Sequence, residues 1–182
     1  MRTYSHALLT WFAVRRLRPS ERGVAAWGAS GATLPDLPAI AGAVWLGARR
    51  RSFSRRGFRE EVCEEGSFGG PDAALHSALP VAALLVLCHP RGKLLASLLG
   101  WAGHVLADAL THAEDARPML WPLSQRRFRS PISYWDSSHH ARAFALAEHG
   151  ALLLIAALTI SRKFRAPRSV SRWLERLAQT EV

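Results

Sequence analysis

Three metal-ligand side chains recur every four residues within an otherwise apolar segment of the chain. They are His104, Asp108 and His112, and the residues between them are almost all valine, leucine or alanine. On a helix this spacing places all three on one face. Imidazole and carboxylate groups are good zinc ligands, whereas an unpaired carboxylate on an apolar face is costly. The segment therefore predicts a helix that either holds a divalent metal ion or pairs Asp108 with histidines in a protein core.

The remaining sequence alternates between apolar segments and short basic clusters. The 182 residues suit one domain, and 49% of them are hydrophobic. No apolar run reaches the roughly 18 uninterrupted residues typical of a spanning helix, but the interruptions are mostly ligand-type or small residues. We expect an all-α chain forming a single helical bundle, with several apolar helices embedded in a membrane. A soluble bundle with very apolar helices is the alternative.

The charge distribution indicates the partners. The formal net charge is +10, and the arginines flank the apolar segments, as in a small bacterial inner-membrane protein. Such a chain suits anionic lipid or a phosphorylated substrate. We expect no nucleic-acid partner, because zinc-finger spacing and RNA-binding signatures are missing from the sequence.

The domain organisation follows from the same patterns. Residues 1–165 are expected to form the helical domain, and residues 166–182 a basic amphipathic tail that lies on a membrane surface. Within the domain, helices are expected over residues 4–17, 73–89, 93–113 and 141–160. The helix over 73–89 would carry His76 at its start and bury Leu79 to Leu87.

Two further positions are ambiguous when taken alone. Asp36 lies between Pro35 and Pro38, so it is expected at a turn, where it either caps the next helix or serves as a ligand. His6 lies near the start of an apolar helix, where a lone histidine is usually structural.

The order of these residues resembles that of a known family. Ser5-His6, the segment 31–36 ending in Pro35-Asp36, Leu75-His76-Ser77 and the segment 103–111 follow one another as in the YdjM-like membrane-bound metal-dependent hydrolases. That family is similar to the helical zinc-dependent phospholipase C and S1/P1 nuclease group. The resemblance covers roughly residues 4–135 and implies a phospholipase C-like bundle. It implies metal ligation by His6, Asp36, His76, His104 and Asp108, with His112 near the position of a further histidine.

What the resemblance implies is a hydrolase. One or two divalent metal ions, expected to be zinc, would activate a water molecule for attack on a phosphoester or phospholipid. Asp36 and Asp108 would bridge the ions or orient that water, and Arg126 and Arg127 would hold the phosphate. The alternative is a non-catalytic helical membrane scaffold with a structural metal or buried Asp–His pairs.

Overall fold

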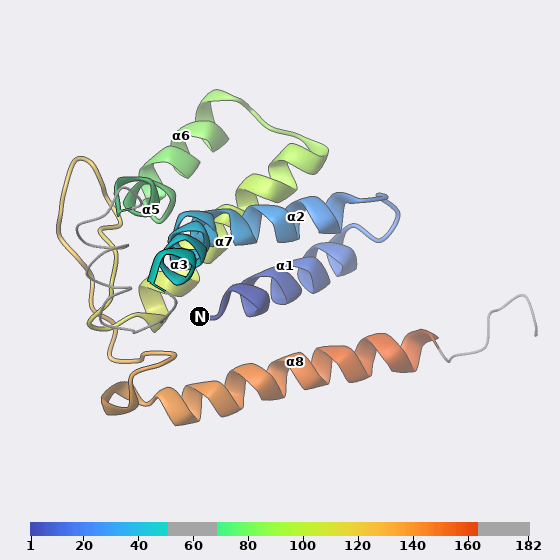
Figure 1. Cartoon of the computed structure of the whole chain (residues 1–182). Coiled ribbons are helices and arrows are strands. Elements are labelled where there is room, and N and C mark those ends of the chain that lie inside the picture. The colour runs from blue at the N-terminus through green and yellow to red at the C-terminus, as the bar shows by residue number, and fades with distance from the viewer. Residues whose placement is uncertain (51–68, 164–182) are drawn as a thin grey trace, which may run out of the picture. The chain divides into compact units, whose positions relative to one another are not determined.

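The computed structural model describes residues 1–50 and 69–163, and this part of the chain is helical, without strands (Figure 1). Its helices are α1 (Thr3–Leu17), α2 (Val24–Thr33), η1 (Leu34–Asp36), α3 (Leu37–Arg50), α5 (Gly69–Leu75), α6 (Ala78–Leu87), α7 (Gly92–Thr111), η3 (Ser137–His139) and α8 (Ala141–Lys163). The all-α prediction is confirmed. The expected amphipathic tail, 166–182, lies outside the described residues. The chain divides into two units, residues 1–146 and 147–182.

Helix α7 is the central element of the first unit, and α2 packs closely against it. Small residues allow this approach: a Cβ atom added at Gly31 would lie 1.9 Å from the carbonyl oxygen of Ser97, and one at Gly100 would lie 2.1 Å from that of Gly28. Close backbone contact through small residues is typical of helix pairs in membranes. Because α1 also packs on α2, the start of α1 and the end of α2 both reach the C-terminal half of α7.

The other side of α7 carries the apolar core. Val81 of α6 packs there with Leu98, Trp101 and Val105 of α7. The indole Nε1 of Trp101 donates to the carbonyl oxygen of Leu75 at 2.6 Å, which fixes the end of α5. This packing places the break between α5 and α6 beside the ligand face of α7.

The chain over 73–89 differs from the expected single helix. Helix α5 ends at Leu75, His76 and Ser77 form the break, and α6 begins at Ala78. Ser77 Oγ caps α6 by accepting from Leu79 N at 3.2 Å, so the preceding residue leaves the helical path. The expected burial of Leu79 to Leu87 is wrong for most of the segment, because Val81 is its one buried residue whereas Leu84, Val86 and Leu87 are exposed.

Residues 112–136 return along the C-terminal end of α7. Ser130 N donates to the carbonyl oxygen of His112, Tyr134 N to that of Thr111, and Ser130 Oγ to that of Leu110. These bonds satisfy carbonyl groups that a helix end leaves unpaired. The loop therefore covers the end of α7 that carries the ligand residues.

Two helices of the described chain are long and apolar enough to cross a membrane, namely α7 and residues Ala141–Ser161 of α8. Together, α5 and α6 also meet the length and composition of a span, although they bend by 51° at their break. The face of α7 that points away from its ligands is apolar, since Leu94, Leu99, Leu106 and Leu110 are each at least half exposed.

Candidate metal centre

Two imidazole rings turn their Nε2 atoms toward the same position. His104 Nδ1 lies 2.7 Å from the carbonyl oxygen of Ala32, and His76 Nδ1 lies 2.9 Å from that of Asp72. A carbonyl oxygen only accepts, so each Nδ1 carries the proton and each neutral ring has its lone pair on Nε2. The two Nε2 atoms are 3.3 Å apart and nearly inaccessible to solvent. At this distance the two nitrogens repel each other unless a proton on one ring or a metal ion lies between them.

Two carboxylates complete a four-membered group. Asp36 comes from η1 and Asp108 from α7, and one ligand atom from each lies within 4.8 Å of those of His76 and His104. His76 Nε2 is 3.6 Å from Asp36 Oδ1 and 3.5 Å from Asp108 Oδ2, and the corresponding distances from His104 Nε2 are 3.7 Å and 3.2 Å.

These separations match a tetrahedral zinc site. Zinc–nitrogen and zinc–oxygen bonds of about 2.0–2.2 Å place tetrahedral ligand atoms about 3.4 Å apart. Five of the six ligand-to-ligand distances of the group lie between 3.2 and 3.7 Å. The group could therefore hold a divalent metal ion with little rearrangement.

The two oxygens of Asp108 have different surroundings. Oδ1 lies 2.9 Å from both His6 Nε2 and the amino group of Met1, which are donors. Oδ2 instead lies 3.2–3.5 Å from the Nε2 atoms of His76, His104 and His112. One oxygen is thus satisfied by protein donors, while the other faces the position that a cation would fill.

His6 supports Asp108 rather than joining the group of four. It is buried in α1 and stacks on the ring of His104, with centroids 3.8 Å apart. Burial lowers the pKa of His6 below its ordinary value, despite the neighbouring carboxylate. A neutral ring donating from Nε2 orients the carboxylate of Asp108, as a residue behind a metal ligand does.

His112 lies on the other side of Asp108, at the end of α7. Its Nδ1 is 2.7 Å from Asp115 Oδ2, which fixes the proton on that nitrogen. Its Nε2 is buried and lies 3.2 Å from Asp108 Oδ2, and it makes no well-aligned hydrogen bond among the described residues. The ring of Tyr134 packs against it with centroids 5.0 Å apart, and burial raises the pKa of Tyr134 to about 12.

Asp36 is held as a carboxylate. Burial alone would raise its pKa, but its contacts with His76, His104 and Thr3 outweigh burial and lower that pKa below its ordinary value. Thr3 Oγ1 donates to Asp36 Oδ2, which leaves Oδ1 facing the two histidines. Asp36 is therefore ionised at neutral pH, as a ligand must be.

The structure brings six of the sequence-predicted residues together around Asp108: His6, Asp36, His76, His104, Asp108 and His112. Arg126 and Arg127 are exposed in the loop after α7, and neither lines the pocket beside this group. Their contact with a substrate stays a prediction.

Three residues around the site were missed by sequence reasoning. Asp72 lies one helical turn before His76, and Asp115 lies three residues after His112, so each spacing was a weak signal of contact. Arg117 bonds to Asp72 through a loop contact without periodicity, which no sequence pattern indicates.

No protein-family model, curated protein or solved structure matches this chain. The resemblance to the YdjM-like hydrolases therefore stays a prediction, and the interpretation of the site depends on its own geometry.

Proposed function

We propose that this chain is a membrane-bound, metal-dependent hydrolase of phosphoesters or phospholipids, with the phospholipase C-like bundle that the YdjM-like resemblance implies. The observation that carries the proposal is the convergence of His76 Nε2, His104 Nε2, Asp36 Oδ1 and Asp108 Oδ2 at tetrahedral spacing. Nitrogen and carboxylate ligands in such a set suit zinc.

The chemistry follows from this donor set. A divalent ion held by these four residues would need a fifth coordination position for a water molecule, whose pKa it would lower, and it would stabilise developing negative charge. The protein's part is to hold the ligands: the carbonyl oxygens of Ala32 and Asp72 fix the two imidazole rings, and His6 fixes the Asp108 carboxylate.

A non-catalytic scaffold is the second candidate function. The observation that favours it is the direct contact between His6 Nε2 and Asp108 Oδ1 at 2.9 Å. A proton on His76 Nε2, which lies 3.5 Å from Asp108 Oδ2, would satisfy the second oxygen in the same way. A structural metal or metal-free Asp–His pairs would then stabilise the bundle without supplying a reaction.

Hydrolysis after metal removal separates the two functions. The purified chain would be assayed on p-nitrophenyl phosphate, bis(p-nitrophenyl) phosphate and phosphatidylcholine micelles, before and after 1,10-phenanthroline. We expect turnover of at least one substrate, lost on chelation and restored by zinc. The scaffold function is supported instead if turnover equals that of a buffer blank both before and after chelation. A fall in the thermal unfolding temperature on chelation would then indicate a structural metal, and an unchanged temperature metal-free Asp–His pairs.

Membrane attachment in a bacterial inner membrane is part of the proposal. Helices α7 and α8 each have the length of a span, and the exposed leucines of α7 would face lipid. We expect the chain to stay in the membrane pellet after washing with alkaline carbonate and to be released by a mild detergent. Release by carbonate alone would favour the soluble bundle.

A further inference from the structure

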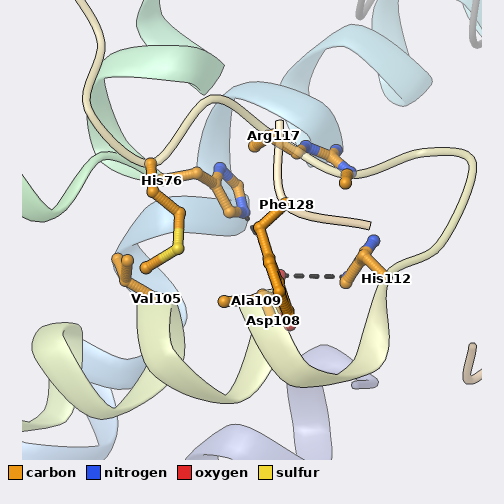
Figure 2. Close-up of a pocket in the computed structure, with 9 residues that line it drawn as sticks. His76, Val105, Asp108, Ala109, His112, Arg117 and Phe128 are labelled. Atoms are coloured by element: carbon orange, nitrogen blue, oxygen red, sulfur yellow. Dashed lines mark ion pairs between the residues drawn. The ribbon is translucent and has the colours of Figure 1, made fainter. Parts of the chain in front are cut away.

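A small cavity lies beside the group of four ligands (Figure 2). Its polar wall consists of His76, Asp108, His112 and Arg117, of which the first two are members of that group. The rest of the lining is apolar, with Phe128 among its residues. The cavity has room for about one water molecule. A water molecule there would lie next to the metal position in a mostly apolar surround.

The imidazole ring of His112 is fixed at one side of this cavity. His112 is the residue at which α7 ends, and its carbonyl oxygen accepts from Ser130 N at 2.9 Å. Asp115 Oδ2 lies 2.7 Å from Nδ1, and the ring of Tyr134 packs against the imidazole. Because the carboxylate holds the proton on Nδ1, the neutral ring has its lone pair on Nε2.

The buried Nε2 atom of His112 needs a donor that the described residues do not supply. It lies 3.2 Å from Asp108 Oδ2, and a carboxylate oxygen only accepts. No well-aligned hydrogen bond reaches Nε2 within the described chain. An unsatisfied buried nitrogen beside a cavity of this size is typical of a place where an ordered water binds. Such a water would donate to Nε2 and keep the lone pairs of its oxygen for the metal.

His112 bounds the metal position without belonging to the ligand group. The residues whose ligand atoms all lie within 4.8 Å of one another are Asp36, His76, His104 and Asp108. A four-ligand zinc site that also binds water needs a fifth position. The cavity offers that position on the side of His76 and Asp108, and His112 is the neighbouring side chain with a free acceptor nitrogen.

We propose that His112 is the general base of the hydrolysis and acts on a water molecule in this cavity. Nε2 takes one proton from the water, the electron pair of the broken O–H bond stays on the oxygen, and that oxygen attacks the phosphorus of the ester. The bond from phosphorus to the leaving oxygen then breaks, and this oxygen keeps the electron pair and receives the proton from Nε2. Asp115 is a positioning residue, which keeps Nδ1 protonated and stabilises the charge that the ring gains. The inference rests on the proposed function and adds the residue that moves the proton.

The zinc-loaded full-length chain in detergent tests this role. His112→Asn puts an amide nitrogen near the position of Nδ1, where it can still donate to Asp115, but has no atom at the position of Nε2. We expect kcat on bis(p-nitrophenyl) phosphate to fall at least about 100-fold, with KM and zinc affinity close to those of the parent. His139→Asn is the matched control, since His139 Nδ1 also lies 3.0 Å from a carboxylate, that of Asp136, and His139 does not line the cavity. This control is expected to keep the parent's kcat.

Cobalt(II) in place of zinc gives a readout that does not depend on turnover. Five-coordinate cobalt absorbs more weakly in the visible range than tetrahedral cobalt. We expect the weaker spectrum for the parent and for His112→Gln, whose side-chain oxygen can accept from the water but is not a base. His112→Asn is expected to give the stronger, tetrahedral spectrum. His112→Gln should thus keep the water and still lose kcat, which a purely structural role for the histidine does not predict.

Three results would overturn the inference. Parent-like kcat in His112→Asn or His112→Gln would show that another group takes the proton. A loss of zinc affinity in these variants as large as that in Asp108→Asn would make His112 a metal ligand. A tetrahedral cobalt spectrum for the parent would show that the cavity holds no metal-bound water. A parent that takes up neither metal, or that is loaded without any turnover, would overturn the proposed function itself, and metal content measured on each sample distinguishes these failures.

Discussion

Replacing Gly100 by alanine is expected to lower the free energy of unfolding by about 3 kcal/mol or more. The added Cβ would lie 2.1 Å from the carbonyl oxygen of Gly28 and 3.0 Å from Ala32 N, so α2 and α7 must move apart. Backbone atoms cannot swing aside as a side chain does. The displacement would also stretch the bond between His104 and Ala32 that orients one metal ligand. Thermal unfolding in detergent and zinc content measure the two effects.

Gly103→Ala is the control on the same helix. Gly103 is exposed, and a Cβ there would meet no atom within 4 Å. Alanine is the better helix former, so this variant is expected to be as stable as the parent or slightly more stable. Equal unfolding temperatures for Gly100→Ala and Gly103→Ala would show that the close packing of α2 on α7 is absent.

Replacing Asp108 by asparagine is expected to weaken zinc binding at least about 100-fold and to reduce metal-dependent hydrolysis by a similar or larger factor. The change keeps the shape of the side chain but removes the charge that faces three imidazole nitrogens at Oδ2. Because asparagine Oδ1 can still accept from His6, the weaker binding measures the missing charge and not the loss of this hydrogen bond. Equilibrium dialysis against a zinc buffer measures the affinity.

Asp136→Asn is the matched control for this variant. Asp136 is a carboxylate at the start of η3 that accepts from Ser138 N, and asparagine serves equally well in that position. We expect unchanged zinc affinity and turnover. If Asp108→Asn retained the parent's affinity while Asp136→Asn lost it, the assignment of ligands would be wrong.

Much of the ligand set was predictable because the four-residue spacing and the apolar neighbours are visible within one short segment of the sequence. His104 and Asp108 lie four apart on an apolar helix, and this pattern determined both their shared face and their place in the interior. For Asp36 the sequence left a cap and a ligand open, since a turn between prolines suits either. The structure turns its Oδ1 toward two histidines, and this depends on how α2 packs against α7.

The parts that sequence reasoning missed depend on tertiary contact. The break at His76 follows from the capping of α6 by Ser77, whose Oγ also donates to carbonyl oxygens of the distant loop residues Met119 and Trp121. Arg117 reaches Asp72 across 45 positions of the chain. Hydrophobic periodicity carries no information on either contact, because each is made with a residue of the loop after α7.

Metal content tests the central claim most directly. The chain would be purified without chelator and analysed by plasma mass spectrometry beside a His104→Ala/Asp108→Ala variant, with helical content checked for both. The account predicts one or two equivalents of zinc or another divalent metal in the parent and almost none in the variant. Two equally folded, metal-free proteins would contradict it and leave a helical scaffold with buried Asp–His pairs.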